Sequence, residues 1–126
     1  MIAPVSITGI GKCVPEKVVT NDDLTQLVET SDEWISKRTG IRARHVAVEE
    51  TAIDLAINAA KSALDMSGER PEDIGVIVAC TITAEELTPS LAGRVQRALD
   101  IPVCAAMDVS AGCTGFVYAL VTAASL

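Results

Sequence analysis

The sequence predicts an α/β fold in which a mostly parallel sheet carries helices on both faces. Apolar runs with the pattern of strands alternate with segments of helical periodicity, in the order β-α-α-α-β-α-β-α. The strand-like run at 74–80 is apolar at consecutive positions, which is typical of a strand covered on both sides. Helical connections between parallel strands are right-handed, so they place the helices over the faces of the sheet.

The N-terminal elements are expected to be short. A strand is predicted at 7–11. Asn21 is predicted to cap a short helix, because its side chain can accept a hydrogen bond from the first free N–H groups. Ser31 is predicted to cap a second short helix, which carries Trp34 and ends near Gly40.

The later elements are longer. A helix is predicted over 51–66, where apolar residues recur at helical spacing. Another helix is predicted over 88–99, with Pro89 at its first helical position. A strand at 103–107 and a helix at 116–126 complete the order.

The last of these helices raises an expectation about the rest of the molecule. It is apolar almost all round, as a helix enclosed between layers would be, and it ends without glycine, basic residues or a polar tail. The 126 residues, 49% of them hydrophobic, suffice for one domain or part of one. We therefore expect the chain to be the N-terminal part of a longer protein, or to pair with other material that buries this helix.

Charge excludes some classes of partner. The net charge of −7 argues against nucleic acid or an anionic membrane as the main partner, because both attract clusters of Lys and Arg. The longest apolar stretch, 116–126, is well short of the ~20 residues that a membrane span needs. Basic residues do gather at Lys37, Arg38, Arg42 and Arg44. This cluster suits a small phosphorylated ligand or an acidic partner protein, with an ordinary solvated face as the alternative.

Cysteine usage points to a reducing compartment. The cysteines at 13, 80, 104 and 113 form no CxxC pair, so no metal site is expected. Cys80 and Cys104 fall in apolar, strand-like runs, where a reduced and buried thiol is ordinary. No secretion signal is recognisable, and the chain is expected to be cytoplasmic.

Cys113 is the candidate nucleophile. It lies in a turn of small residues, 108–116, between a strand-like run and an apolar helix. A side chain at this point lies beside the unpaired N–H groups of the helix, whose partial positive charge favours a thiolate over a thiol. The alternative from local pattern alone is that Cys113 is a small buried hydrophobe.

Three motifs carry a resemblance to a known family: 29–35 (Glu-Thr-Ser-Asp-Glu-Trp-Ile), 38–45, and 108–116 around Cys113. In this order and at this spacing, the chain resembles β-ketoacyl-acyl carrier protein synthase III of the thiolase superfamily over essentially all of its residues. The resemblance implies a thiolase-like fold of two similar halves in a five-layered αβαβα architecture. Residues 1–126 would then form an incomplete N-terminal domain, with the second half absent from the chain.

The resemblance also implies a function. Members of the family start type II fatty-acid synthesis by joining an acyl-CoA to malonyl-acyl carrier protein through an acyl-cysteine, with release of CoA and carbon dioxide. Coenzyme A enters as a thioester substrate, so neither cofactor nor metal is implied, and a cytoplasmic homodimer is expected. The alternatives are a related acyl-CoA starter enzyme of polyketide or secondary metabolism, and a non-catalytic CoA-binding module.

Four residues of this chain match functional positions of the family. Cys113 matches the nucleophile that takes the acyl group. Trp34 matches a tryptophan that stacks on the adenine of CoA, and Thr30 and Arg38 match neighbours that contact the same nucleotide. Without the resemblance, a lone Trp on a short helix would be interpreted as a core residue.

One position departs from the family pattern. Many members carry Phe just before the Pro of the second βα connection, and this aromatic closes the acyl pocket of the dimer partner; here the residue is Thr88. Its absence implies room for a medium, long or branched acyl group, unless Leu87 fills the space. The single histidine, His45, is expected to be structural, partly buried and hydrogen-bonded. The catalytic His and Asn of the family would lie in the second half, so the chain alone is expected to be inactive.

Overall fold

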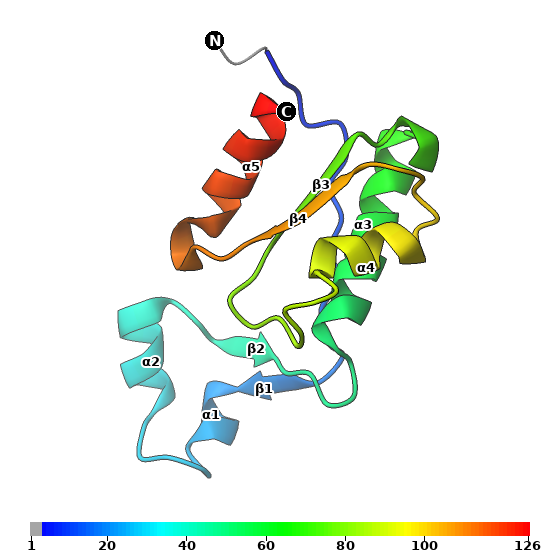
Figure 1. The fold of residues 1–126 in the computed structure, drawn as a ribbon. Coiled ribbons are helices and arrows are strands. Elements are labelled where there is room, and N and C mark those ends of the chain that lie inside the picture. Colours follow the sequence, from blue (N-terminus) through cyan, green and yellow to red (C-terminus); the bar gives the residue numbers. More distant parts are fainter. Residues whose placement is uncertain (1–3) are drawn as a thin grey trace. The chain divides into compact units, whose positions relative to one another are not determined.

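The computed structural model describes residues 4–126, which divide into two compact units. The first, here called the sheet unit, comprises Met1–Cys13 and Ala52–Leu126. The second, called the hairpin unit, comprises Val14–Thr51. Figure 1 shows the elements of both.

The sheet unit is built on two parallel strands. Strand β3 (Val76–Cys80) pairs in parallel with β4 (Ala105–Val109) along the full length of both. Helix α5 (Gly115–Ser125) lies on one face, while α3 (Ala52–Ser67) and α4 (Leu91–Ala98) lie on the other (Figure 1). The predicted parallel sheet with helices on both faces is therefore confirmed.

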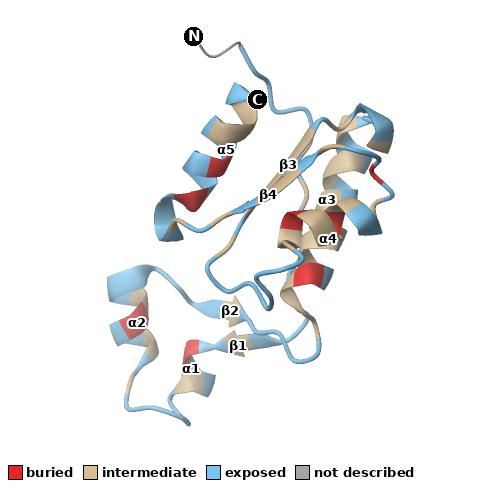
Figure 2. Cartoon of the chain, in the orientation of Figure 1, coloured by how far each residue is buried: buried red, intermediate tan, exposed pale blue. Residues whose placement is uncertain are grey.

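Burial in this unit is uneven. The buried apolar side chains of the unit are few and come from both sides of the sheet (Figure 2): Ile53, Ala92, Val95, Ile101 and Ala119. The apolar helix α5, in contrast, leaves Phe116 71% and Val121 47% exposed. Within this chain, α5 is thus covered on one side only, and the expectation of a helix enclosed between layers is not met by the chain alone.

The segment 7–11 differs from its prediction, because no strand is present in residues 4–15. The segment is extended and lies against α3, where the N–H of Ile10 donates to Sδ of Met66 over 3.2 Å. Thr8 and Gly9 border an open hollow of about 240 Å³ that α3, β3 and α4 also line. Segment 7–11 therefore packs on α3 and does not pair with another strand.

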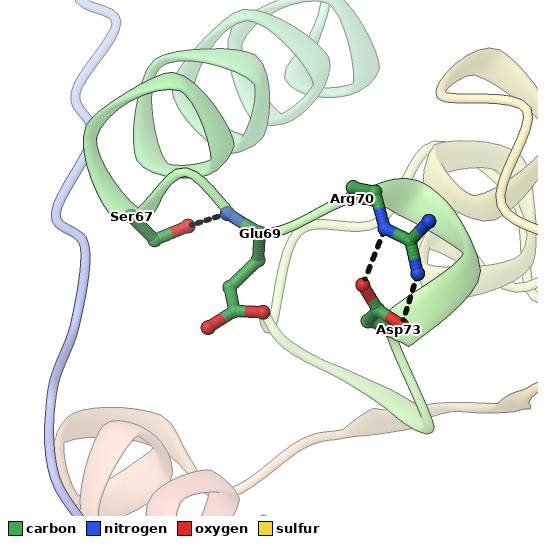
Figure 3. A network of polar contacts seen from close by, with 4 residues as sticks. All are labelled: Ser67, Glu69, Arg70 and Asp73. Carbon is green, nitrogen blue, oxygen red and sulfur yellow. Dashed lines mark hydrogen bonds and ion pairs between the residues drawn. The ribbon is translucent and has the colours of Figure 1, made fainter.

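A polar turn leads from α3 to β3 (Figure 3). Ser67 Oγ accepts a hydrogen bond from the N–H of Glu69 over 3.1 Å. Arg70 then forms a two-pronged ion pair with Asp73, with Nε 2.8 Å from Oδ2 and Nη2 3.0 Å from Oδ1. This pair brackets the 3₁₀ turn Pro71–Asp73 and fixes the entry of the chain into β3. Both side chains are exposed, so the pair orders the turn more than it stabilises the fold.

The boundaries of two predicted elements shift. Helix α4 begins at Leu91 and not at Pro89, because Ser90 is its N-cap and accepts from the N–H of Gly93 over 3.1 Å. The strand predicted at 103–107 is β4 at Ala105–Val109, and Val103 before it is fully exposed.

The hairpin unit contains two short strands that the sequence did not predict. Strands β1 (Val18–Thr20) and β2 (Ala43–His45) pair antiparallel. Helix α1 (Asn21–Leu24) follows β1 directly, and α2 (Asp32–Thr39) precedes β2. A strand of three residues is too short to show an alternating pattern, which explains why the sequence did not reveal them.

Asn21 is not the cap that the sequence predicted. Thr20 caps α1 in a capping box, in which Thr20 Oγ1 accepts from the N–H of Asp23 and the Asp23 carboxylate accepts from the N–H of Thr20. Asn21 is 1% exposed, and its Nδ2 donates to Oδ1 of Asp32 over 2.8 Å and to the carbonyl of Ile41 over 2.7 Å. Asn21 therefore acts as a tertiary link at the centre of the hairpin unit.

Candidate active site

Cys113 lies where the sequence predicted, between a strand and a helix. Strand β4 ends at Val109, the 3₁₀ turn Gly112–Thr114 follows, and α5 begins at Gly115. Gly112 has a φ of +53°, a conformation that favours glycine. The Cys113 side chain is exposed. Within this chain the Cys113 thiol is therefore not buried, while its role as a nucleophile stays a prediction.

Backbone donors are available beside this side chain. The turn is closed by the N–H of Thr114, which donates to Ala111, and by the N–H of Gly115, which donates to Gly112. These bonds do not engage the N–H of Cys113. No side chain within residues 4–126 caps the start of α5, since Thr114 Oγ1 donates to the Ala111 carbonyl. Free N–H groups at a helix start can stabilise an oxyanion that develops next to the sulfur.

Cys80 corrects a second expectation about the cysteines. It is the last residue of β3 and is exposed, whereas Cys13 and Cys104 are half-buried. Its sulfur occupies the space that a Cβ on Gly115 would need, so the first turn of α5 rests on Cys80. Gly115 itself is buried. Exposure alone thus does not single out Cys113, and the helix start is what distinguishes the two thiols.

The carboxylate of Asp108 is a feature that sequence reasoning missed. Asp108 lies on β4, and its two oxygens accept hydrogen bonds from the first two N–H groups of α4. The distances are 2.7 Å from Leu91 N to Oδ2 and 2.8 Å from Ala92 N to Oδ1. The residues lie 16 and 17 positions apart, so no local pattern could have revealed the contact.

The loop between β3 and α4, residues 81–90, borders a hollow near the strand that leads to Cys113. The hollow has a volume of about 290 Å³, and Leu87, Asp108 and Ser110 are among its lining residues. Thr88 is exposed and does not line it. Leu87, one of the two candidate acyl-pocket residues, therefore borders this hollow, although 95% of its own surface is exposed.

Trp34 and Arg38 form a pair on α2. They lie one helical turn apart, and the guanidinium carbon of Arg38 is 4.3 Å from the centroid of the Trp34 ring. Trp34 is 53% exposed, so it is not a core residue. Ser31 caps this helix as predicted, with its Oγ accepting from the N–H of Trp34 over 3.1 Å. Thr30 precedes the cap, Trp34 lies in the first turn of α2, and Arg38 lies in its last turn.

The basic cluster divides into free and engaged members. Arg44 is engaged, since its Nη2 donates to Oδ1 of Asn21 over 2.7 Å and its Nη1 donates to the Val19 carbonyl over 3.3 Å. Arg42 is exposed, and it adds to the hydrogen bonds from Asn21 and Ser36 that lower the pKa of Asp32. Lys37 and Arg38 are also exposed. An anionic ligand would therefore meet Lys37, Arg38 and Arg42 before Arg44.

His45 has the structural contact that the sequence suggested. Its Nδ1 lies 2.6 Å from the carbonyl of Pro15, and the contact requires the proton on Nδ1 because a carbonyl only accepts. The side chain is exposed, so the expected partial burial is wrong. The histidine joins the end of β2 to the segment that precedes β1.

Glu50 is a second polar feature that sequence reasoning missed. Its carboxylate accepts backbone hydrogen bonds from Val48 over 3.0 Å, Glu49 over 3.2 Å and Glu16 over 3.3 Å. Backbone donors led by the N–H of Val48 lower the pKa of Glu50 to about 2. The side chain thus ties the end of the hairpin unit to its beginning.

Within residues 4–126, no three His, Cys, Asp or Glu side chains gather in a way that could hold a metal ion. None of the helices in this part of the chain is both long and apolar enough to cross a membrane.

Solved structures with the same fold define the class of protein. The chain superposes on 3-oxoacyl-[acyl-carrier-protein] synthase III from Aquifex aeolicus with a TM-score of 0.90 and 45% identity, covering 93% of this chain and 38% of that one. It superposes on the priming β-ketosynthase of the R1128 polyketide pathway with a TM-score of 0.90 and 34% identity, covering 94% and 36%. The fold is therefore the thiolase-type fold of condensing enzymes, present here in part.

Curated relatives narrow the class to one family. The chain is 55% identical to β-ketoacyl-[acyl-carrier-protein] synthase III of Thioalkalivibrio sulfidiphilus over 115 residues, which are 90% of this chain and 36% of the relative. It is 50% identical to the Caulobacter vibrioides synthase III over 115 residues, again 90% and 36%. The resemblance to β-ketoacyl-acyl carrier protein synthase III is thereby confirmed. The chain spans little more than a third of the length of these relatives. No family model matches it.

Proposed function

We propose that this chain is the nucleophile-bearing, N-terminal segment of an initiating condensing enzyme of type II fatty-acid synthesis, an acyltransferase. The observation that carries the proposal is an exposed cysteine at the start of α5 in a chain 55% identical to a synthase III. Acyl-CoA and malonyl-acyl carrier protein are the proposed substrates. The proposed state is a cytoplasmic homodimer that uses no cofactor or metal.

In the first proposed step, Sγ of Cys113 attacks the thioester carbonyl of acyl-CoA. The negative charge that develops on the carbonyl oxygen is stabilised by the N–H of Cys113, which the turn leaves unengaged. The C–S bond to CoA then breaks, and CoA leaves as a thiolate that takes up a proton from water. In the second step, malonyl-acyl carrier protein loses carbon dioxide, and the resulting carbanion attacks the acyl carbon and releases the Cys113 thiolate. Groups that would assist this step, the expected His and Asn, are proposed to lie outside this chain.

The nucleotide of CoA is proposed to bind on α2. Arg38 covers one face of the Trp34 ring, and an adenine can stack on the ring where it is exposed. Arg38 and its exposed basic neighbours would meet the phosphates, and Thr30 would contact the nucleotide from the start of the helix. The acyl chain is proposed to enter the hollow beside Leu87. With Thr88 where many members carry Phe, a medium, long or branched acyl group is proposed to fit, unless Leu87 fills the space.

A priming ketosynthase of polyketide synthesis is the second candidate. The R1128 enzyme matches the fold with the same TM-score as the Aquifex enzyme, although at 34% identity against 45%. A non-catalytic CoA-binding module is a third hypothesis. The exposed apolar face of α5 argues against that module acting alone, because such a face is costly in water.

Acylation of Cys113 tests the proposal. The experiment uses the complete enzyme, meaning this segment joined to the remainder of a synthase III, for which the Thioalkalivibrio sulfidiphilus relative is a suitable donor. After incubation with acetyl-CoA, peptide mass spectrometry should locate one acetyl group on Cys113. Cys113→Ala should abolish the adduct, whereas Cys80→Ala, which removes the other exposed thiol, should retain it. An adduct on Cys80 or on neither thiol would refute the proposed nucleophile.

A further inference from the structure

Asp108 differs from the other helix caps of the sheet unit because it reaches between elements. Its carboxylate on β4 accepts from the N–H groups of Leu91 and Ala92, the first two residues of α4. Ser90 accepts from the next N–H, that of Gly93, but Ser90 belongs to the same helix end. Two side chains thus take the first three N–H groups of α4, and only one of them links the helix to the sheet.

On the β4 side of this contact between Asp108 and α4, the chain leads to Cys113. Asp108 is the penultimate residue of β4, and the strand runs through Val109 and Ser110 into the turn that holds Cys113. Within residues 4–126, Asp108 is the only side chain of this strand and turn that hydrogen-bonds to α4. A shift of the Asp108 backbone would therefore be passed along a short stretch of chain to the sulfur.

The other side of the link is the loop 81–90, which leads into α4. Its first residue is tied back to β4, because the N–H of Thr81 donates to the Val109 carbonyl over 3.3 Å. Its middle is held by Glu85, which accepts from the N–H of Ala52 over 3.0 Å and lies 3.5 Å from Nη1 of Arg94. Its end enters α4 at the N–H groups that Asp108 holds. The hollow of about 290 Å³ is lined by this loop together with Asp108 and Ser110.

We infer that Asp108 is a positioning residue that fixes the spacing between the Cys113 turn and segment 81–87, the part of the loop that borders the hollow. The inference rests on the proposed function, because it concerns the same nucleophile and the same hollow. A carboxylate suits the task, since it offers two acceptor oxygens to two consecutive N–H groups and its charge complements the positive end of the helix. An amide offers one acceptor only, so Asn at this position would hold one of the two N–H groups.

The test compares Asp108→Ala and Asp108→Asn with Ser90→Ala in the complete enzyme. Ser90→Ala is the matched control, because it removes a bond from the same helix turn without touching the link to β4. Acyl transfer to Cys113 is followed by intact mass for acyl-CoA chains from two to eight carbons. Asp108→Ala should lower the maximal rate by about tenfold or more, since small misplacements of reacting groups have costs of at least that order. It should also alter the ratio of short-chain to long-chain rates, with Asp108→Asn between Ala and wild type.

Two measurements distinguish a positioning role of Asp108 from an effect on the stability of the fold alone. The acyl-CoA concentration that gives half-maximal rate should change less than about twofold, because the proposed nucleotide contacts at Trp34 and Arg38 belong to the hairpin unit. Ser90→Ala should lower the melting temperature by a similar amount but leave the chain-length ratio at the wild-type value. If Asp108→Ala or Asp108→Asn lowers the melting temperature without altering maximal rate or chain-length ratio, Asp108 is only a helix cap and the inference is wrong.

Hydrogen exchange keeps the inference testable if Cys113 of the wild type takes up no acyl group, which would refute the proposed function instead. Asp108→Asn should then accelerate exchange at the amides of Leu91 and Ala92 and, together with them, at 110–115. Ser90→Ala should accelerate exchange in α4 alone. Unchanged exchange at 110–115 in the Asp108→Asn protein would show that the two segments are not coupled.

Discussion

The helices of the hairpin unit and helix α5 of the sheet unit differ in whether a side chain caps the first N–H groups of the helix. In the hairpin unit, both helices begin at a side-chain cap, Thr20 for α1 and Ser31 for α2, and α2 ends at Gly40 in the left-handed conformation. Helix α5 begins with no side-chain cap, and its apolar residues are largely exposed. Side chains thus cap both helix starts of the hairpin unit, whereas no side chain caps the start of α5.

This difference has a functional meaning. A capped helix start has its N–H groups satisfied, and so it offers little to a substrate. At the start of α5 the turn engages the N–H groups of Thr114 and Gly115, but it leaves the N–H of Cys113 free for a negative charge that develops beside the exposed thiol. The exposed apolar side chains of α5 further indicate a surface that other material must cover. The chemistry is thus proposed to lie at the helix start that no side chain caps.

The largest effect is expected from the chain used alone. If the α5 region is incomplete, the 126-residue chain should not condense acyl-CoA with malonyl-acyl carrier protein, and carbon dioxide release should stay at background. The complete enzyme under the same conditions is the positive control. Steady turnover by the chain alone would show that α5 needs no further partner and that the decarboxylating groups lie within these residues.

The next effect concerns the packing beneath α5. Gly115→Ala should destabilise the complete enzyme by about 1–3 kcal/mol, because the new Cβ would overlap Sγ of Cys80. The effect runs against helix propensity, which favours Ala over Gly. Cys80→Ala in the same protein should restore most of the stability, since it removes the overlapping sulfur. Urea unfolding of the two single variants and the double variant measures the coupling. Equal stability of Gly115→Ala with and without Cys80 would contradict this contact.

Local patterns predicted the structural setting of Cys113 well. The strand, small-residue turn and helix around Cys113 are contiguous in the chain, so their order alone specifies the arrangement. The Ser31 cap and the parallel pairing of β3 with β4 were predicted for similar reasons. The pairing of Trp34 with Arg38 follows from their spacing of four residues on a helix, a signal that was available in the sequence.

The failed predictions involve competition or distance. Asn21 is a good capping residue, but Thr20 takes that role because Asp23 can return the bond, and the buried amide of Asn21 holds distant partners. Asp108 contacts α4 across a long sequence separation, which no single segment could reveal. Cys80 was expected to be buried because its run is apolar, yet it ends the strand at an exposed position. Local chemistry therefore predicts elements better than it predicts contacts between them.

A moderate effect is expected at the one large aromatic of the hairpin unit. Trp34→Ala should weaken CoA binding by the complete enzyme by about 1–3 kcal/mol, the range typical of base–aromatic stacking. Acylation at saturating acyl-CoA should change little. Glu33→Gln is the matched control, because it changes an exposed charged residue of the same helix without touching the ring or a proposed phosphate contact. Calorimetry with CoA measures both. An affinity unaltered by Trp34→Ala would leave Trp34 as a surface packing residue.

The smallest effect tests whether a polar side chain, Glu50, holds the two ends of the hairpin unit together. Glu50 has a pKa of about 2, below the 4.5 of an ordinary glutamate, because it accepts backbone bonds from Val48, Glu49 and Glu16. A lowered pKa means that the folded state favours the carboxylate, so its contribution is fully present above pH 4.5 and is lost as the pH falls toward 2. Carbon-13 NMR of the side-chain carboxyl should give a midpoint near 2 in the 126-residue chain.

Glu50→Gln should remove this part of the pH dependence of urea unfolding while leaving that of Asp23 and Asp32, whose pKa values are also lowered. A Glu50 midpoint near 4.5 would mean that the carboxylate does not hold the two ends of the hairpin unit together.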